Sequence, residues 1–117
     1  MKVLVCGSRD FANPFTVSLA IDKRISELPV PTHVIHGAAP GADRMAATAA
    51  ERHGHNVQPF PADWDTHGRR AGILRNLRML DEKPDLVIAY WNGKSNGTAH
   101  TISEARKRGI PVEVIVA

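Results

Sequence analysis

The sequence predicts an α/β fold built on a mainly parallel sheet, and three observations support this. Short apolar runs alternate along the chain with segments whose apolar residues repeat at helical spacing, which indicates strands joined by crossover helices. Several of the apolar runs end in turns rich in glycine and small polar residues. The chain has 117 residues, enough for one hydrophobic core but not two. We expect a single Rossmann-like, three-layer domain over residues 1–117, with a five-stranded sheet in the order 3-2-1-4-5 and helices on both faces.

The first half of the chain contains three expected strands and two expected helices. The run at 2–6 reads as a buried strand, and Asn13-Pro14 begins a helix with Asn as N-cap and Pro at the first helical position. Its apolar residues repeat up to a stop at Pro29. A strand at 33–36, a glycine turn at 37–41 and an alanine-rich helix at about 42–53 follow, and Gly54 suits the cap after this helix. A third strand is expected at 56–60.

The second half repeats the alternation after a long polar stretch. Residues 61–70, PADWDTHGRR, show no periodicity and read as a loop long enough to cover a site. The next helix is expected to bury one apolar stripe, formed by Ile73, Leu74, Leu77 and Leu80. An apolar strand at 85–90, a turn at 91–98, a helix at about 98–108 and a last strand at 112–116 complete the predicted fold.

The turns after the strands predict an anion-binding site. With strand order 3-2-1-4-5, the chain reverses direction between strands 1 and 4, so a ligand crevice is expected over their carboxyl ends. Glycine turns and helix N-termini offer free N–H groups and the positive end of the helix dipole. The candidate ligand-binding and phosphate-binding residues are Gly7, Ser8, Arg9, Gly37, Ala38, Gly41, Ala42, Asp43, Arg75, Asn76, Asn96, Gly97 and Thr98.

Each polar candidate also has a structural interpretation. Arg75 offers a planar fork of donors that matches phosphate oxygens, but it could instead belong to a solvated basic helix face. Arg9 could hold a phosphate or pair with Asp43, which could itself be a helix cap. Thr98 is a candidate N-cap as well as a candidate phosphate ligand. Trp64 and Trp91 could stack on a base or pack within the protein.

Composition and missing motifs exclude several functions. The chain is 43% hydrophobic and 23% charged, with a net charge of +3, which fits phosphate-bearing partners without indicating nucleic acid. The dinucleotide fingerprint G-x-G-x-x-G does not occur. Gly93-Lys94-Ser95 resembles the end of a P-loop, but Ile88 stands where the earlier glycine is required. We therefore expect no cofactor.

The histidines and the single cysteine do not suggest a metal site. No H-E-x-x-H motif and no cysteine pair occur. Cys6 is expected to be a small buried residue, and His53 and His55 are expected at the surface. No apolar run is long enough to span a bilayer, and Met1 leads directly into a strand, so we expect a cytoplasmic protein with no membrane partner.

With these turns placed, the chain resembles the SLOG superfamily, and most closely its YspA-type, cpYpsA-related branch. The matching segments are Val5–Phe11, His36-Gly37 with Gly41–Asp43, Phe60–Trp64, Ala71–Asn76 with Met79, and Asn96–Thr98. The Gly-Ser-Arg and Gly-Ala-Asp segments also resemble the DNA-processing proteins of natural transformation. The resemblance implies a Rossmann-like fold, a nucleotide or nucleotide-derived ligand, and a homo-oligomer.

The best-known enzymes of this superfamily are the LOG-type phosphoribohydrolases, which cleave the bond between base and ribose 5′-phosphate. Their signature, P-G-G-x-G-T-x-x-E, is only partly present. Gly97-Thr98 fits its G-T pair, but Thr101 stands at the position of the catalytic Glu. Glu104, one helical turn further on, and Arg75 remain the candidate catalytic residues.

Three functions remain open at the level of sequence. The first is a sensor or weakly catalytic protein that binds a nucleotide or nucleotide-derived molecule, and the missing Glu favours it. The second is a nucleotide-processing enzyme that hydrolyses an N-glycosidic bond. The third is a single-stranded nucleic-acid binder, which ranks last because the chain lacks a row of interleaved aromatic residues.

Overall fold

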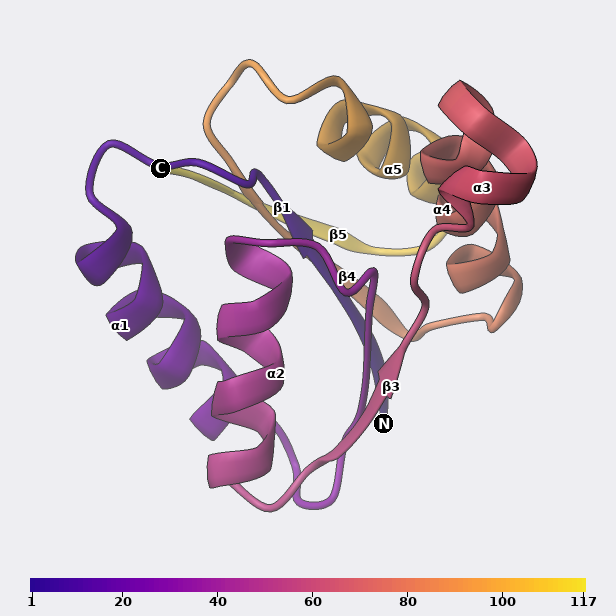
Figure 1. Cartoon of the computed structure of the whole chain (residues 1–117). Helices are drawn as coiled ribbons and strands as arrows, with labels where there is room; N and C mark the ends of the chain where they lie inside the picture. Colours follow the sequence, from indigo (N-terminus) through magenta and orange to yellow (C-terminus); the bar gives the residue numbers. More distant parts are fainter.

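A computed structural model describes all of residues 1–117, and its centre is a five-stranded parallel sheet (Figure 1). The strand order is β3-β2-β1-β4-β5, as predicted. The strands are β1 (Lys2–Gly7), β2 (His33–His36), β3 (Asn56–Pro59), β4 (Leu86–Trp91) and β5 (Val112–Val116). Met1 precedes the first strand and Ala117 follows the last. Because the strands are parallel, the two termini lie at opposite ends of the strands, the N-terminus at the amino end of the central strand and the C-terminus at the carboxyl end of β5 (Figure 1).

Helices cover both faces of this sheet. One layer contains α1 (Pro14–Ser26) and α2 (Ala42–Arg52), and the other contains α4 (Ala71–Asp81) and α5 (Asn96–Lys107) (Figure 1). The alternation of side chains along β1 explains the two cores, because successive residues of a strand point to opposite faces. Val3 and Val5 belong to the core under α1 and α2, whereas Leu4 and Cys6 belong to the core under α4 and α5.

The connection between β3 and α4 is not the plain loop that the sequence predicted. It contains a short helix, α3 (Trp64–His67), and a 3₁₀ turn, η1 (Gly68–Arg70). The carboxylate of Asp63 accepts a hydrogen bond from the Thr66 N–H at 3.1 Å and so caps α3. A four-residue helix is too short to produce a hydrophobic period, and the capping residue was its only signal.

Two expectations about exposure were also wrong. In α4, Ile73 is 48% exposed, and the buried residues are Ala71, Asn76, Met79 and Leu80. His55, expected at the surface, is 7% exposed. Its Nδ1 accepts from the Thr32 N–H, and its Nε2 lies 3.0 Å from the Ile25 carbonyl oxygen. His55 therefore ties the end of α1 to the start of β2. None of the helices is long and apolar enough to cross a membrane.

Candidate functional site

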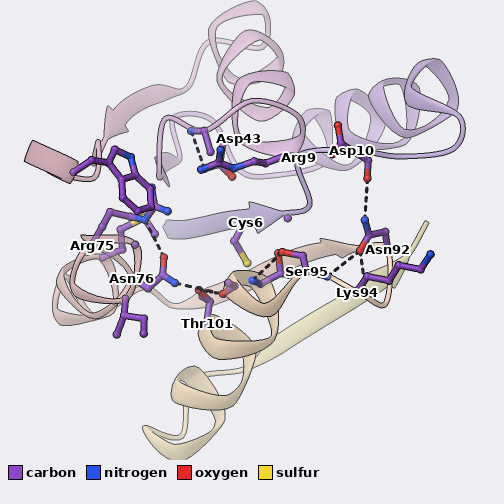
Figure 2. A pocket seen from close by; sticks show the side chains of 18 of the residues that line it. Cys6, Arg9, Asp10, Asp43, Arg75, Asn76, Asn92, Lys94, Ser95 and Thr101 are labelled. Carbon is purple, nitrogen blue, oxygen red and sulfur yellow. Dashed lines mark hydrogen bonds between the residues drawn. The ribbon is translucent and has the colours of Figure 1, made fainter. Parts of the chain in front are cut away.

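A cavity of about 490 Å³ lies at the carboxyl edge of the sheet (Figure 2). It lies where β1 and β4, the two strands at the reversal of the chain, run into their turns. This is the position at which open parallel sheets bind ligands, and the volume is within the usual range for ligand sites, roughly 300–1,000 Å³. The predicted residues that line it are Gly7, Arg9, Asp43, Arg75, Asn76, Gly97 and Thr98.

The remaining predicted residues do not line the cavity: Ser8, Gly37, Ala38, Gly41, Ala42 and Asn96. Ser8 is 1% exposed, and its hydroxyl accepts a hydrogen bond from the Asn92 N–H at 3.0 Å. The Asn92 side chain in turn donates to the carbonyl of Asp10 at 3.1 Å. Ser8 thus joins the turns that follow β1 and β4 and holds two walls of the cavity together.

Two glycines allow the backbone turns to approach each other closely. A Cβ atom on Gly7 would lie 2.5 Å from the Ala42 Cβ. Gly41 has a φ of +83°, and a Cβ atom there would lie 2.5 Å from the carbonyl oxygen of Ser8. The Ala42 N–H also donates to that Ser8 oxygen at 3.2 Å. These glycines therefore position the turn before α2 against the turn after β1. Gly7 also lines the cavity, whereas Gly41 does not.

Asp43 stabilises the glycine turn and does not cap α2, whose N-cap is Gly41. Its Oδ2 accepts from the Gly37 N–H at 2.9 Å and from the Ala39 N–H at 3.3 Å. The side chain is almost fully buried, and this desolvation raises the pKa of Asp43 to about 6. Arg75 and Arg9 lie close enough to lower that pKa. Arg9 and Asp43 form no ion pair, so the alternative in which Arg9 pairs with Asp43 does not hold.

Arg75 is half-buried in the cavity wall and is held by two contacts. Its Nη1 donates to the carbonyl of Gly37, and its Nε donates to the Oδ1 of Asn76 at 2.9 Å. A guanidinium has five N–H donors, so donors remain for a ligand after these two bonds. Arg75 thus lies at the cavity, as predicted, rather than on a fully solvated face, and it also supports the turn that contains Gly37.

The start of α5 forms the wall opposite α2. Ser95 is the N-cap of this helix, so the expectation that Thr98 caps it was wrong. The hydroxyl groups of Ser95 and Thr98 lie 3.0 Å apart. Asn76 reaches this helix from α4, since its Nδ2 donates to the Gly97 carbonyl at 3.4 Å. The Ser95 hydroxyl accepts from the Thr98 N–H at 3.4 Å, and the positive end of the helix dipole lies at this wall of the cavity.

The carboxylate chemistry of LOG-type enzymes has no counterpart on this wall. Thr101 lines the cavity, and its hydroxyl donates to the Gly97 carbonyl at 3.2 Å. Glu104 does not line the cavity and lies 3.6 Å from the ammonium group of Lys107. Cys6 lines the cavity, and burial raises the pKa of its thiol, which keeps it protonated. No group of three or more His, Cys, Asp or Glu side chains could hold a metal ion.

Most of the cavity lining lies outside the predicted site residues. Asp10, Asn92, Lys94 and Ser95 come from turns that the sequence placed at this edge, so their positions were a signal. Trp64, which the sequence offered as a base-stacking candidate, lies in α3 and also lines the cavity. Arg69, Gly72 and Ile73 come from η1 and the first turn of α4 and were not expected there. Trp91 is a structural residue, because its indole N–H donates to the Ser95 carbonyl at 3.0 Å.

The fold, with a basic cavity where the chain reverses direction between β1 and β4, defines a Rossmann-like α/β protein. Residues 1–67 match the YspA, cpYpsA-related SLOG family, and the chain belongs to this family. It is also 40% identical over 116 residues to the Gene 61 protein of Mycobacterium phage D29, covering 95% of this chain and 93% of the phage protein. The match confirms the resemblance that the sequence motifs indicated.

Comparison with solved structures supports the same fold. DNA processing protein A (DprA) of Streptococcus pneumoniae superposes with a TM-score of 0.79 and 22% identity, covering 99% of this chain and 50% of DprA. The chain thus spans about half the length of DprA, and the likeness shows the fold alone. The C-terminal domain of a Pyrococcus furiosus hydrogenase, with a TM-score of 0.49 and 18% identity over 98% of this chain and 91% of that domain, is too distant to add to this.

Proposed function

We propose that this protein binds a nucleotide or nucleotide-derived molecule and that the phosphate of this ligand occupies the cavity. The charge of the cavity wall carries the proposal. Four basic side chains line it, Arg9, Arg69, Arg75 and Lys94, against two acidic ones, Asp10 and Asp43. Asp43 is already engaged by two backbone N–H groups, so the potential available to a ligand favours an anion.

The start of α5 adds to this potential. Gly97 and Thr98 from its first turn line the same cavity as Arg75, and phosphate binds at helix N-termini through free N–H donors and the helix dipole. Family membership supports the same ligand class, because the SLOG resemblance implies nucleotides and their derivatives. We further propose that the protein acts in the cytoplasm and as a homo-oligomer.

A role as a binder or sensor is better supported than a role as an N-glycosidic hydrolase. The observation that favours it is Thr101, which faces the cavity where LOG-type enzymes carry a glutamate. Incubation with nucleoside 5′-monophosphates should therefore release no free base above the rate without protein. Chromatographic detection of free base, abolished by Arg75→Ala, would instead favour the enzyme.

The first prediction tests the phosphate site through Arg75. Arg75→Ala should weaken binding of AMP by roughly ten- to a hundred-fold, because a charge-assisted hydrogen bond contributes about 1.5–3 kcal/mol. Arg75→Lys should recover only part of the loss, since an ammonium group cannot reproduce the planar fork. Adenosine, which has no phosphate, should bind the parent and the variant equally. Isothermal titration calorimetry measures all of these affinities.

Arg78→Ala is the matched control, because Arg78 lies on the same helix and outside the cavity, with its guanidinium 5.8 Å from the ring centre of Phe60. It should bind AMP as the parent does. Equal losses of AMP and adenosine in Arg75→Ala would show that Arg75 acts only by holding the Gly37 turn. Absence of AMP binding by the parent protein would overturn the phosphate site.

A further inference from the structure

The cavity lining includes two large apolar side chains that phosphate recognition does not explain. Trp64 and Ile73 both line it and remain 51% and 48% exposed, respectively. Large apolar side chains that stay half-exposed in a cavity keep unfavourable contact with water. Resting on the function proposed above, we propose that these two side chains form an aromatic subsite, which binds the base of a free mononucleotide whose phosphate lies at Arg75.

The position of Trp64 is set by the elements around it. It is the first residue of α3, whose N-cap is Asp63. Its indole lies against α4, because a Cβ atom built on Gly72 would be 3.4 Å from the Cη2 of Trp64. A larger residue than alanine at position 72 would push the ring away from the helix. Gly72 therefore lets the ring approach the helix at Cη2, while Trp64 as a whole stays half-exposed and lines the cavity.

The spacing along α4 fits a nucleotide. Gly72, which the indole approaches, and Arg75 are three residues apart, which corresponds to roughly 4.5 Å along a helix axis. Ile73 lies between them in the sequence and also faces the cavity. The Trp64 and Arg75 side chains line the same cavity. A base on Trp64 would thus leave its phosphate within reach of Arg75 and of the start of α5.

The chemistry of the subsite indicates what it can distinguish. An indole and an aliphatic side chain offer a face for stacking, and stacking is tolerant of base identity because every base has a π-face. The polar neighbour from the same region is Arg69, an exposed side chain of η1. The subsite should therefore favour purines over pyrimidines by their larger ring area and distinguish poorly between adenine and guanine.

The second prediction tests this subsite by comparing AMP with ribose 5-phosphate, which lacks the base. In the parent protein AMP should bind more tightly, by roughly five- to a hundred-fold for one stacked base. Trp64→Ala should remove most of that difference and leave the affinity for ribose 5-phosphate unchanged. Trp64→Phe should keep most of it. AMP should also quench tryptophan fluorescence in the parent, which has two tryptophans, but not in Trp64→Phe.

Phe15→Ala is the control, because Phe15 is an aromatic residue that is 72% exposed and lies outside the cavity. It should bind both ligands as the parent does, and thermal unfolding should show that every variant is folded. If ribose 5-phosphate binds as tightly as AMP, or if Trp64→Ala keeps the difference between them, the aromatic subsite is wrong while the phosphate site stands. If neither ligand binds the parent, the phosphate site fails and the subsite with it.

A last experiment tests whether the ligand is a free mononucleotide or a nucleotide within a single strand of nucleic acid. A 5′-phosphorylated single-stranded oligonucleotide should bind no more tightly than AMP, and its affinity should fall with salt as expected for about one phosphate contact. A strand that binds at least ten-fold more tightly, with a steep salt dependence and the same sensitivity to Trp64→Ala, would overturn the assignment to a free mononucleotide.

Discussion

Asp43 shows how one buried carboxyl can both order a turn and carry an electrostatic cost. It holds the Gly37 and Ala39 N–H groups, yet burial disfavours its charged form. The sequence placed Asp43 at the right edge of the sheet. It could not show which backbone groups the carboxylate accepts from, since that depends on the path of the turn before α2.

The third prediction follows from the pKa of Asp43, which rises from 3.8 to about 6 on folding. Between these values the folded state holds a proton that the unfolded chain has lost. The free energy of unfolding should therefore fall as pH rises from about 4 to above 6. Each step of one in pKa corresponds to about 1.4 kcal/mol, so the fall attributable to Asp43 is about 3 kcal/mol.

Urea unfolding of the parent and of Asp43→Asn across this pH range measures that fall. The asparagine keeps an acceptor oxygen for the two N–H groups but does not titrate, so this part of the pH dependence should vanish in the variant. Parallel pH profiles for the two proteins would contradict the assignment to Asp43.

At the scale of elements, the turn between β2 and α2 depends on its fit against the turn after β1. Gly41 and Gly93 both require positive φ, at +83° and +82°, but only Gly41 has backbone atoms where a side chain would be. A Cβ atom at Gly93 would meet nothing within 4 Å. A side chain at position 93 would therefore meet only backbone strain, whereas one at position 41 would meet both strain and a steric clash.

The fourth prediction uses this pair. Gly93→Ala should cost about 1–2 kcal/mol of stability, the strain of a left-handed alanine. Gly41→Ala should cost clearly more and also weaken AMP binding, because the clash with the Ser8 and Arg9 carbonyls moves a wall of the cavity. Chemical denaturation and calorimetry of both variants provide the comparison. Equal losses of stability in the two variants would mean that the turns are not tightly packed at Gly41.

The elements that the sequence misjudged share one physical cause. Periodicity reports which residues are apolar, and it does not report what covers them. Ile73 fits the apolar stripe of α4 but faces the cavity, whereas Asn76 is buried because it donates to α5. His55 is polar and follows a helix end, yet its ring is buried by two backbone partners. The strands were predictable because both faces of each inner strand are covered and their sequences are continuously apolar.

At the scale of the whole molecule, the strand order could be predicted because few topologies satisfy right-handed crossovers in a parallel sheet. The position of the cavity followed from that order. The presence of Trp64 and Arg69 in its lining did not, since both come from the segment that crosses from β3 to α4. The path of such a connection is decided by tertiary contacts, such as the indole on Gly72, rather than by local sequence.

The fifth prediction concerns assembly. Phe15 and Leu19 are 72% and 56% exposed on the same side of α1, four residues apart, and exposed apolar pairs of this kind suit a symmetric contact between two copies. The protein should be a homo-oligomer by light scattering at micromolar concentration. Replacing both residues with Asp should reduce the mass to that of a monomer. Arg106→Asp, on α5 across the sheet, should leave it unchanged, and a monomeric parent would contradict the prediction.

The placement of the chain ends bears on how each of these experiments should be built. The Ala117 N–H donates to the Trp91 carbonyl at 2.9 Å, so the chain ends beside the last residue of β4, at the edge that carries the cavity. Met1 lies at the other edge, where its carbonyl accepts from the His33 N–H at 2.8 Å. A purification tag or fluorophore fused after Ala117 would emerge at the carboxyl ends of the strands, where the cavity lies. One fused before Met1 would emerge at their amino ends, away from the cavity.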